Sequence, residues 1–229
     1  LPPFADLFNH SVSAKSKHSF DAETRRLICR TSDSFKTGEE SLFNYGAFPN
    51  SKLLRLYGFA VPNNPFDIVD LWAPIGKVAF LTLDPSISLI SSTQPQAPFF
   101  KEKLKLLQQE GISNDGSFEL VYGRLNERLL TALRVQRLED ITEFQKRDKG
   151  TGVINVRNEA IALESLIGGL QGMLEAYPST LMEDLKLLKQ KDTLTVRRQC
   201  ILHLQISEKK ILLNNLQLLQ QKQSVLLQK

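Results

Sequence analysis

The chain has 229 residues, of which 41% are hydrophobic and 24% charged, and this length suits one large domain or two small ones. That balance excludes an intrinsically disordered chain. The formal net charge is only +4 and basic residues alternate with acidic ones, so the sequence has no nucleic-acid-binding footprint. No apolar run approaches the ~18 residues that a membrane-spanning helix needs. We therefore expect neither nucleic acid nor a membrane as a partner.

The residues that could bind a metal are too scattered in the sequence to form a site. Cys29 and Cys200 lie far apart, and we predict two buried free thiols rather than a disulfide. His18 and His203 each lack a second ligand nearby, so a zinc site is not predicted. Phosphate-binding glycine loops, nucleophile elbows and zinc-type His-Glu-x-x-His motifs are also missing from the sequence.

The first third of the chain reads as strands and loops. Its expected strands and apolar segments are, in chain order, 25–31, 41–45 and 53–59. Turn-forming residues at 21–24 and 37–38 precede the first two of them.

From about residue 98 the apolar residues recur with the 3.6-residue period of helices. The predicted helices cover 99–109, 126–138, 158–177, a segment from Thr180, and a last one from Thr193 or Thr195 to the C-terminus. In the first of them an apolar face lies opposite lysines, and Gly111 is expected to end it. Thr180 and Glu183 have the spacing of a capping box.

The last helix contains a partial heptad repeat. Apolar residues recur every seven positions at Leu204, Ile211, Leu218 and Val225. Such a seam would either dimerise as a coiled coil or pack on its own domain. Because Glu208 and Asn214-Asn215 interrupt the seam, we predict that the helix packs on its own domain and that the protein is a monomer.

The middle of the chain fits neither pattern. Residues 76–83 have the composition of a strand, and an irregular stretch rich in Ser, Thr, Gln and Pro follows them. We interpret this region as a linker or insertion. The predicted division is therefore a β-rich part over 1–70, a linker over 71–98 and a helical part over 99–229.

Five polar or aromatic residues of the first part are candidates for a site. Asn9 and His10 are either a paired contact to a ligand or an ordinary hydrogen-bonded pair at a strand end. Tyr45 and Tyr57 suit half-buried packing as well as chemistry. Asp6 alone suits a helix cap. From these residues alone the alternatives stay open.

Taken in order, four segments form a recognisable combination. They are Asp6-Leu7-Phe8-Asn9-His10-Ser11, Gly38-Glu39-Glu40, Phe43-Asn44-Tyr45-Gly46 and Leu56-Tyr57-Gly58-Phe59. This combination resembles the C-terminal half of a SET domain of the kind found in Rubisco large-subunit methyltransferase-like enzymes. The later half, with residues 177–184 and the segment from Arg197-Arg198 to Leu212, resembles the helical substrate-binding domain of that family.

The resemblance implies an α+β fold, a partial β-rich SET fold followed by an all-α substrate-binding domain. It implies a protein-lysine N-methyltransferase that uses S-adenosyl-L-methionine and a protein substrate bearing the target lysine. By position, Asn9 and His10 match the cofactor-binding pair of the family and Tyr45 its catalytic tyrosine. Asp6 and Tyr57 match residues that shape its lysine channel.

The chain also departs from the family pattern, because it starts at Leu1 without the N-terminal SET segment and its glycine-containing cofactor motif. We expect a fragment that alone binds cofactor poorly and methylates nothing. The alternative from another class is a non-catalytic protein-interaction module built on the helical domain. Methylation of histidine instead of lysine is a third possibility. Chloroplast, cytoplasm and nucleus all remain open as compartments.

Overall fold

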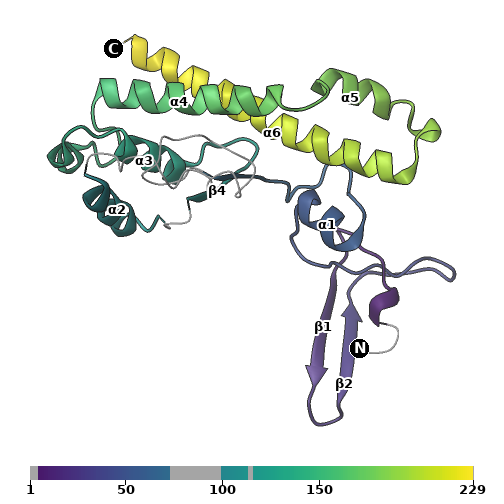
Figure 1. Ribbon diagram of the computed structural model, residues 1–229. Coiled ribbons are helices and arrows are strands. Elements are labelled where there is room, and N and C mark those ends of the chain that lie inside the picture. Colours follow the sequence, from purple (N-terminus) through teal and green to yellow (C-terminus); the bar gives the residue numbers. More distant parts are fainter. Residues whose placement is uncertain (1–4, 73–98, 113–115, 229) are drawn as a thin grey trace. The chain divides into compact units, whose positions relative to one another are not determined.

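The computed structural model describes residues 5–72, 99–112 and 116–228 (Figure 1). The chain forms two compact units, Leu1–Asp67 and Ile68–Lys229. The strand predicted at 76–83, and all but the start of the predicted linker, lie outside the described residues. The three-part division of the sequence therefore stays a prediction.

A β-hairpin is the main regular element of the first unit. Strand β1 (Ser16–Asp21) pairs antiparallel with β2 (Arg26–Thr31). The Asp21 carboxylate accepts the backbone N–H groups of Glu23 and Thr24 at 3.0 and 3.2 Å, which shapes the turn between the strands. The predicted strand at 25–31 and its preceding turn are confirmed. Its partner β1 was not predicted, because its mostly exposed side chains give no apolar alternation.

Helix α1 (Asn50–Tyr57) replaces the strand-and-loop structure expected for residues 53–59, and that prediction was wrong. The helix buries Leu53 completely. It ends at Gly58, whose φ of +79° favours glycine and whose N–H donates to the carbonyl of Leu54 at 3.1 Å. With only eight residues, the segment is too short for its helical period to stand out in the sequence.

The buried side chain of Asn50 fixes the loop that follows α1. Its amide nitrogen donates to the carbonyl of Val61 at 2.9 Å, and its oxygen accepts the N–H of Val61 at 2.7 Å. The same nitrogen and the Asn50 backbone N–H donate to the two carboxylate oxygens of Asp67 at 2.9 and 2.6 Å. These bonds hold the loop from Gly58 to Val61, and with it Phe59, against the start of the helix.

The second unit is mainly helical. Its strands and helices are β3 (Val69–Trp72), α2 (Phe100–Gln109), β4 (Ser117–Leu120), α3 (Glu127–Gln136), η3 (Ile141–Lys146), α4 (Val156–Glu175), α5 (Leu181–Leu188), η4 (Lys191–Thr193) and α6 (Val196–Leu227). Strands β3 and β4 pair antiparallel, with Leu71 opposite Phe118. The expectation of an all-α second part is corrected by this small sheet. Its strands have only four residues each, too few to reveal a period.

All five predicted helices of this unit are confirmed, and their starts have local causes. The side chains of Asn126, Asn155 and Thr195 cap α3, α4 and α6 by accepting a backbone N–H three residues on. Thr180 and Glu183 form the predicted capping box of α5, and such a cap contributes about 1 kcal/mol.

Helix α2 differs from its prediction in one lysine. It ends before Gly111, which has a φ of +68°, as expected. Lys103, however, is buried rather than on an exposed lysine face, and its Nζ donates to the carbonyl of Gln136 at 3.0 Å. Burial, assisted by nearby Arg137, lowers the pKa of Lys103. The carbonyl at the end of α3 thus compensates for burying an ammonium group, a contact that the period of α2 cannot reveal.

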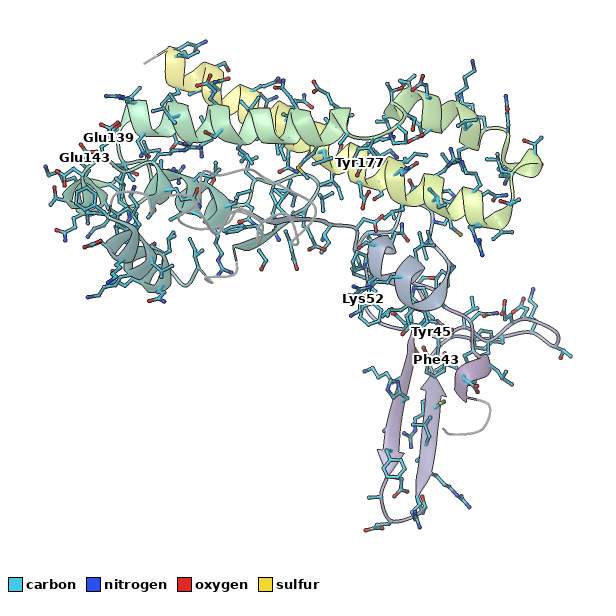
Figure 2. All side chains as sticks on the ribbon, viewed as in Figure 1. Phe43, Tyr45, Lys52, Glu139, Glu143 and Tyr177 are labelled. Atoms are coloured by element: carbon cyan, nitrogen blue, oxygen red, sulfur yellow. The ribbon has the colours of Figure 1, made fainter. Side chains whose placement is uncertain are left out.

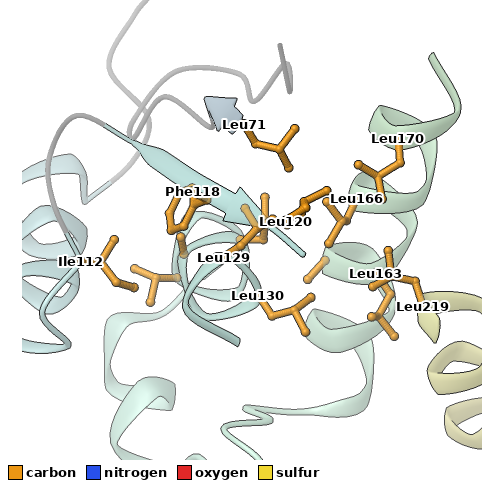
Figure 3. Close-up of a cluster of buried hydrophobic side chains, with 14 of the residues drawn as sticks. Leu71, Ile112, Phe118, Leu120, Leu129, Leu130, Leu163, Leu166, Leu170 and Leu219 are labelled. Atoms are coloured by element: carbon orange, nitrogen blue, oxygen red, sulfur yellow. The ribbon is translucent and has the colours of Figure 1, made fainter. Parts of the chain in front are cut away.

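The core of the second unit lies between the small sheet and the helices α3, α4 and α6 (Figure 3). Its members include Leu71, Phe118, Leu120, Leu129, Leu130, Leu163, Leu166, Leu170 and Leu219. These side chains come from segments far apart in sequence. The core therefore holds the strands and helices of the unit together, and it is not what makes any single helix form.

Helix α6 packs within its own unit, as predicted. It contacts α4 and α5, and it buries Ile211, Leu212 and Leu219. The residues that interrupt the heptad have partners in the same unit. The Asn215 amide donates to the carbonyl of Val121 at 2.9 Å, and the oxygen of Asn214 accepts the N–H of Gly123 at 2.6 Å. These polar residues fix α6 against the loop after β4.

A polar cluster is buried where α5 meets α6. Lys209 and Asp184 form an ion pair with side-chain exposures of 1% and 0%. The Ser179 hydroxyl donates to the second Asp184 oxygen at 2.6 Å and lies 3.2 Å from the Lys209 ammonium. The Tyr177 ring lies 4.8 Å from that ammonium, and its hydroxyl donates to Glu208 at 2.7 Å (Figure 2 labels Tyr177). Burial and the Glu208 carboxylate raise the pKa of Tyr177.

The cysteines correct one expectation and confirm another. Both are free thiols, but Cys29 is exposed on the hairpin and only Cys200 is buried. A two-stranded ribbon has no second layer to cover Cys29. Within the described ranges, no group of three or more His, Cys, Asp or Glu side chains could hold a metal ion. No helix in the same ranges has the length and apolar character that crossing a membrane requires.

Candidate active site

Backbone hydrogen bonds join the two motif-bearing segments of the first unit. The N–H of Ser11 donates to the carbonyl of Phe43 at 2.9 Å, and the N–H of Phe43 donates to the carbonyl of Asn9 at 2.8 Å. The result is an isolated parallel bridge between His10 and Phe43. The fold therefore brings the two motif-bearing segments together. The prediction of a strand over 41–45 was wrong, because this segment forms only the one bridge at Phe43.

Hydrogen bonds of Asn44 that involve side chains explain why the strand does not continue. Its backbone N–H donates to the hydroxyl of Ser16 at 3.0 Å, and its amide donates to the carbonyl of Val12 at 3.2 Å. Its side-chain oxygen accepts the N–H of Gly46 at 2.8 Å. Such local bonds replace a β-ladder. Gly46 has a φ of +132°, and a Cβ there would lie 3.0 Å from the ring of Phe48, so only glycine fits the turn.

Three aromatic side chains gather around Tyr45. Its ring centroid lies 5.0 Å from that of His10, 4.9 Å from that of Tyr57 and 6.3 Å from that of Phe59. The rings of His10 and Phe59 are 5.7 Å apart, which closes the group. Three of the five candidate residues therefore meet in one aromatic cluster, which we define as His10, Tyr45, Tyr57 and Phe59.

Two hydrogen bonds fix the orientation of Tyr45. Its hydroxyl donates to the carbonyl of Phe8 at 2.5 Å, and its backbone N–H donates to Nδ1 of His10 at 3.1 Å. Burial, with a smaller contribution from Tyr57, raises the pKa of Tyr45, so the phenol is neutral at physiological pH. Because the proton points at Phe8, the lone pairs of the hydroxyl oxygen remain available to accept a hydrogen bond.

His10 is held as a neutral ring with a spare nitrogen. Since Nδ1 accepts from Tyr45, the proton of the neutral ring belongs on Nε2. Nε2 is buried and has no hydrogen-bond partner among the described residues. Burial lowers the pKa of His10, and a backbone interaction with Phe43 opposes that shift. A buried donor without a partner is uncommon in folded proteins and suits a position that a ligand completes.

The remaining candidates, Asp6 and Asn9, lie on the segment that leads to His10. Asn9 donates its side-chain amide to Glu40 at 2.5 Å. Glu40 belongs to the Gly-Glu-Glu motif, for which no contact was predicted. Glu39 accepts the N–H of Lys36 at 2.8 Å, so the adjacent carboxylates serve different partners. Asp6 is exposed in η1 (Ala5–Leu7), which directly precedes Phe8, the acceptor for Tyr45.

Comparison with known proteins identifies the family. A family model described as Rubisco LSMT substrate-binding matches residues 94–212. The chain belongs to the Rubisco LSMT substrate-binding family. The family assignment agrees with the resemblance of the helical half of the sequence.

Curated relatives are also similar to this LSMT-type chain. "N-lysine methyltransferase SETD6" of Mus musculus is 25% identical over 234 residues, which cover 93% of this chain and 47% of the relative. "SET domain-containing protein 4" of Mus musculus is 30% identical over 165 residues, 71% of this chain and 34% of the relative. The chain thus spans less than half the length of these curated relatives.

A solved structure shares the fold. "Structure of Rubisco LSMT bound to Sinefungin and Monomethyllysine" matches with a TM-score of 0.76 and 24% identity, over 100% of this chain and 51% of that one. The predicted α+β class, with SET-type and helical parts, is confirmed.

Proposed function

We propose that the protein transfers methyl groups from S-adenosyl-L-methionine to lysine side chains of a protein substrate. The observation that carries the proposal is the position of Tyr45, neutral, hydrogen-bonded to the Phe8 carbonyl and surrounded by His10, Tyr57 and Phe59. The relatives include an N-lysine methyltransferase, which supports the same reaction class.

On the cofactor side, we assign Asn9 and His10. The bound cofactor would supply a methyl group on a positively charged sulfur. Aromatic faces attract such a cation, and a neutral His10 does not repel it. The unpartnered Nε2 of His10 is a donor for a polar group of the cofactor. The contact of Asn9 with Glu40 would orient its amide.

On the lysine side, we assign Tyr45, Tyr57 and Asp6. Methyl transfer needs a neutral amine in line with the methyl group, so alignment dominates over acid–base chemistry. An apolar aromatic surrounding disfavours the charged ammonium and lowers the pKa of an inserted lysine. The free lone pairs of the Tyr45 oxygen would accept an N–H of that amine and aim its own lone pair. The helical unit would hold the substrate protein, and the protein would act as a monomer.

The direct test uses the full-length gene product that carries this chain. Incubation with radiolabelled cofactor and an extract of methylation-depleted cells should label protein. Hydrolysis should release the label as methyllysine. Calorimetry with S-adenosylhomocysteine should show binding. Label recovered as methylhistidine would mean that the acceptor is histidine and not lysine. A protein without affinity for the cofactor would contradict the proposal and favour a non-catalytic interaction module.

Cofactor affinity should also depend on pH through His10. Its lowered pKa keeps the ring neutral at pH 7, and acidification below its ordinary value of about 6.5 should charge it. A charged ring would repel the sulfonium, so affinity for S-adenosylmethionine should fall as the pH drops through that lower pKa. Calorimetric titration from pH 7.5 down to about 5 should show the fall in the wild type and lose it in His10→Gln. The same fall in His10→Gln would exclude His10 as its cause.

A further inference from the structure

The hairpin β1–β2 carries two like charges directly opposite each other. In its register Lys17 faces Arg30, and directly opposite residues share one face of a sheet. Alternation along the strands places Ser19 and Ile28 on that face too, and Asp21 and Arg26 at its turn end. At the other end Lys15 and Ser32, just outside the strands, line the same hollow as Lys17 and Arg30. We call this surface, Lys15, Lys17, Ser19, Arg30 and Ser32, the basic face of the hairpin.

The basic face borders a hollow of about 440 Å³, and no Asp or Glu is among the residues that line it. Arg30 donates to the hydroxyl of Ser19 at 3.4 Å, so its guanidinium lies along the hollow. The walls therefore combine cations with hydroxyl donors, the groups that bind carboxylates and other anions.

Carboxylates near the hairpin do not neutralise these cations. None of the ion pairs formed among the described residues involves Lys15, Lys17 or Arg30. Asp33 accepts the backbone N–H of Lys15 at 2.8 Å, and Asp21 is occupied with the N–H groups of its turn. Two like charges directly opposite each other destabilise a hairpin. A pair that costs stability in this way is typical of a surface kept for function.

We propose that the basic face binds an acidic segment of a partner protein, with Asp or Glu carboxylates between Lys17 and Arg30. A uniformly charged nucleic-acid backbone suits it less, because Asp21, Glu23 and Asp33 on the same hairpin would repel it. A peptide can place its carboxylates at the hollow alone. The proposal does not rest on methyl transfer, since the basic face lies outside the aromatic cluster.

A competing explanation assigns these charges to protection of open strand edges against aggregation. The two explanations differ for the variant Lys17→Glu/Arg30→Glu. It keeps a like-charge pair and charged edges, so edge protection persists. It reverses the sign of the face, so binding of an acidic segment does not persist.

The test is fluorescence anisotropy with the full-length gene product and a labelled twelve-residue peptide of alternating Glu and Ser. The wild type should bind the Glu peptide and bind the matched Gln peptide much more weakly. Its affinity for the Glu peptide should fall as the salt concentration rises. The variant K17E/R30E should bind roughly tenfold more weakly. The control variant K186E/R197E, with the same change of net charge on exposed residues of the helical unit, should stay within about twofold.

Reversal of specificity separates a binding defect from unfolding. K17E/R30E should gain affinity for a peptide of alternating Lys and Ser, a gain that an unfolded hairpin would not give. Equal losses in both variants, equal binding of the Gln peptide, or tighter binding of a single-stranded DNA of equal charge would overturn the proposal.

Discussion

Replacing Tyr45 with phenylalanine should lower the rate of methyl transfer by about 10²–10³-fold and leave affinity for S-adenosylhomocysteine within about threefold. The phenyl ring would keep the contacts with His10, Tyr57 and Phe59. The lost hydroxyl is the group whose proton is donated to the Phe8 carbonyl and whose lone pairs remain able to accept a hydrogen bond. Without it, an incoming amine loses its acceptor, and misalignment reduces the rate rather than the binding of the cofactor.

The matched control is Tyr122→Phe, which removes a hydroxyl from an exposed tyrosine of the helical unit. Single-turnover measurements at saturating cofactor should show wild-type rates for it. A rate within tenfold of the wild type in Tyr45→Phe would remove the role that we give this residue. A parallel loss of cofactor affinity would instead place Tyr45 in the cofactor pocket.

The helices of the second unit could be predicted from the sequence because their signals are local. A cap at Thr180 or Thr195 and an apolar period of 3.6 need no knowledge of the rest of the chain. Helix α1 was missed, since its stability depends on distant partners. Its first residue, Asn50, is held by Val61 and Asp67, eleven and seventeen residues later.

The candidate site shows the same division. Motif order pointed to His10, Tyr45 and Tyr57, and the structure brings these three together. The bond from Tyr45 to the Phe8 carbonyl spans 37 residues and uses a backbone atom, which has no sequence signature. The contact of Asn9 with Glu40 also depends on the fold, although the Gly-Glu-Glu motif contained its acceptor.

Breaking the buried pair between Asp184 and Lys209 should strongly destabilise the helical unit. Asp184→Leu leaves a buried ammonium without its carboxylate, which costs about 3–5 kcal/mol in free energy of unfolding. Urea denaturation followed by circular dichroism measures this cost. The double variant Asp184→Leu/Lys209→Met removes both charges and should recover most of the loss. A double variant as unstable as Asp184→Leu would mean that packing, not charge, causes the effect.

Lys209→Met alone should cost less than Asp184→Leu, because the two charges have unequal support. Asp184 keeps the hydroxyl of Ser179 and lies in the first turn of α5, where the helix dipole favours a negative charge. Lys209 would keep only the Ser179 oxygen and the ring of Tyr177. The order of the two single variants therefore tests whether the helix terminus stabilises the carboxylate. Equal costs would assign the stability to the ion pair alone.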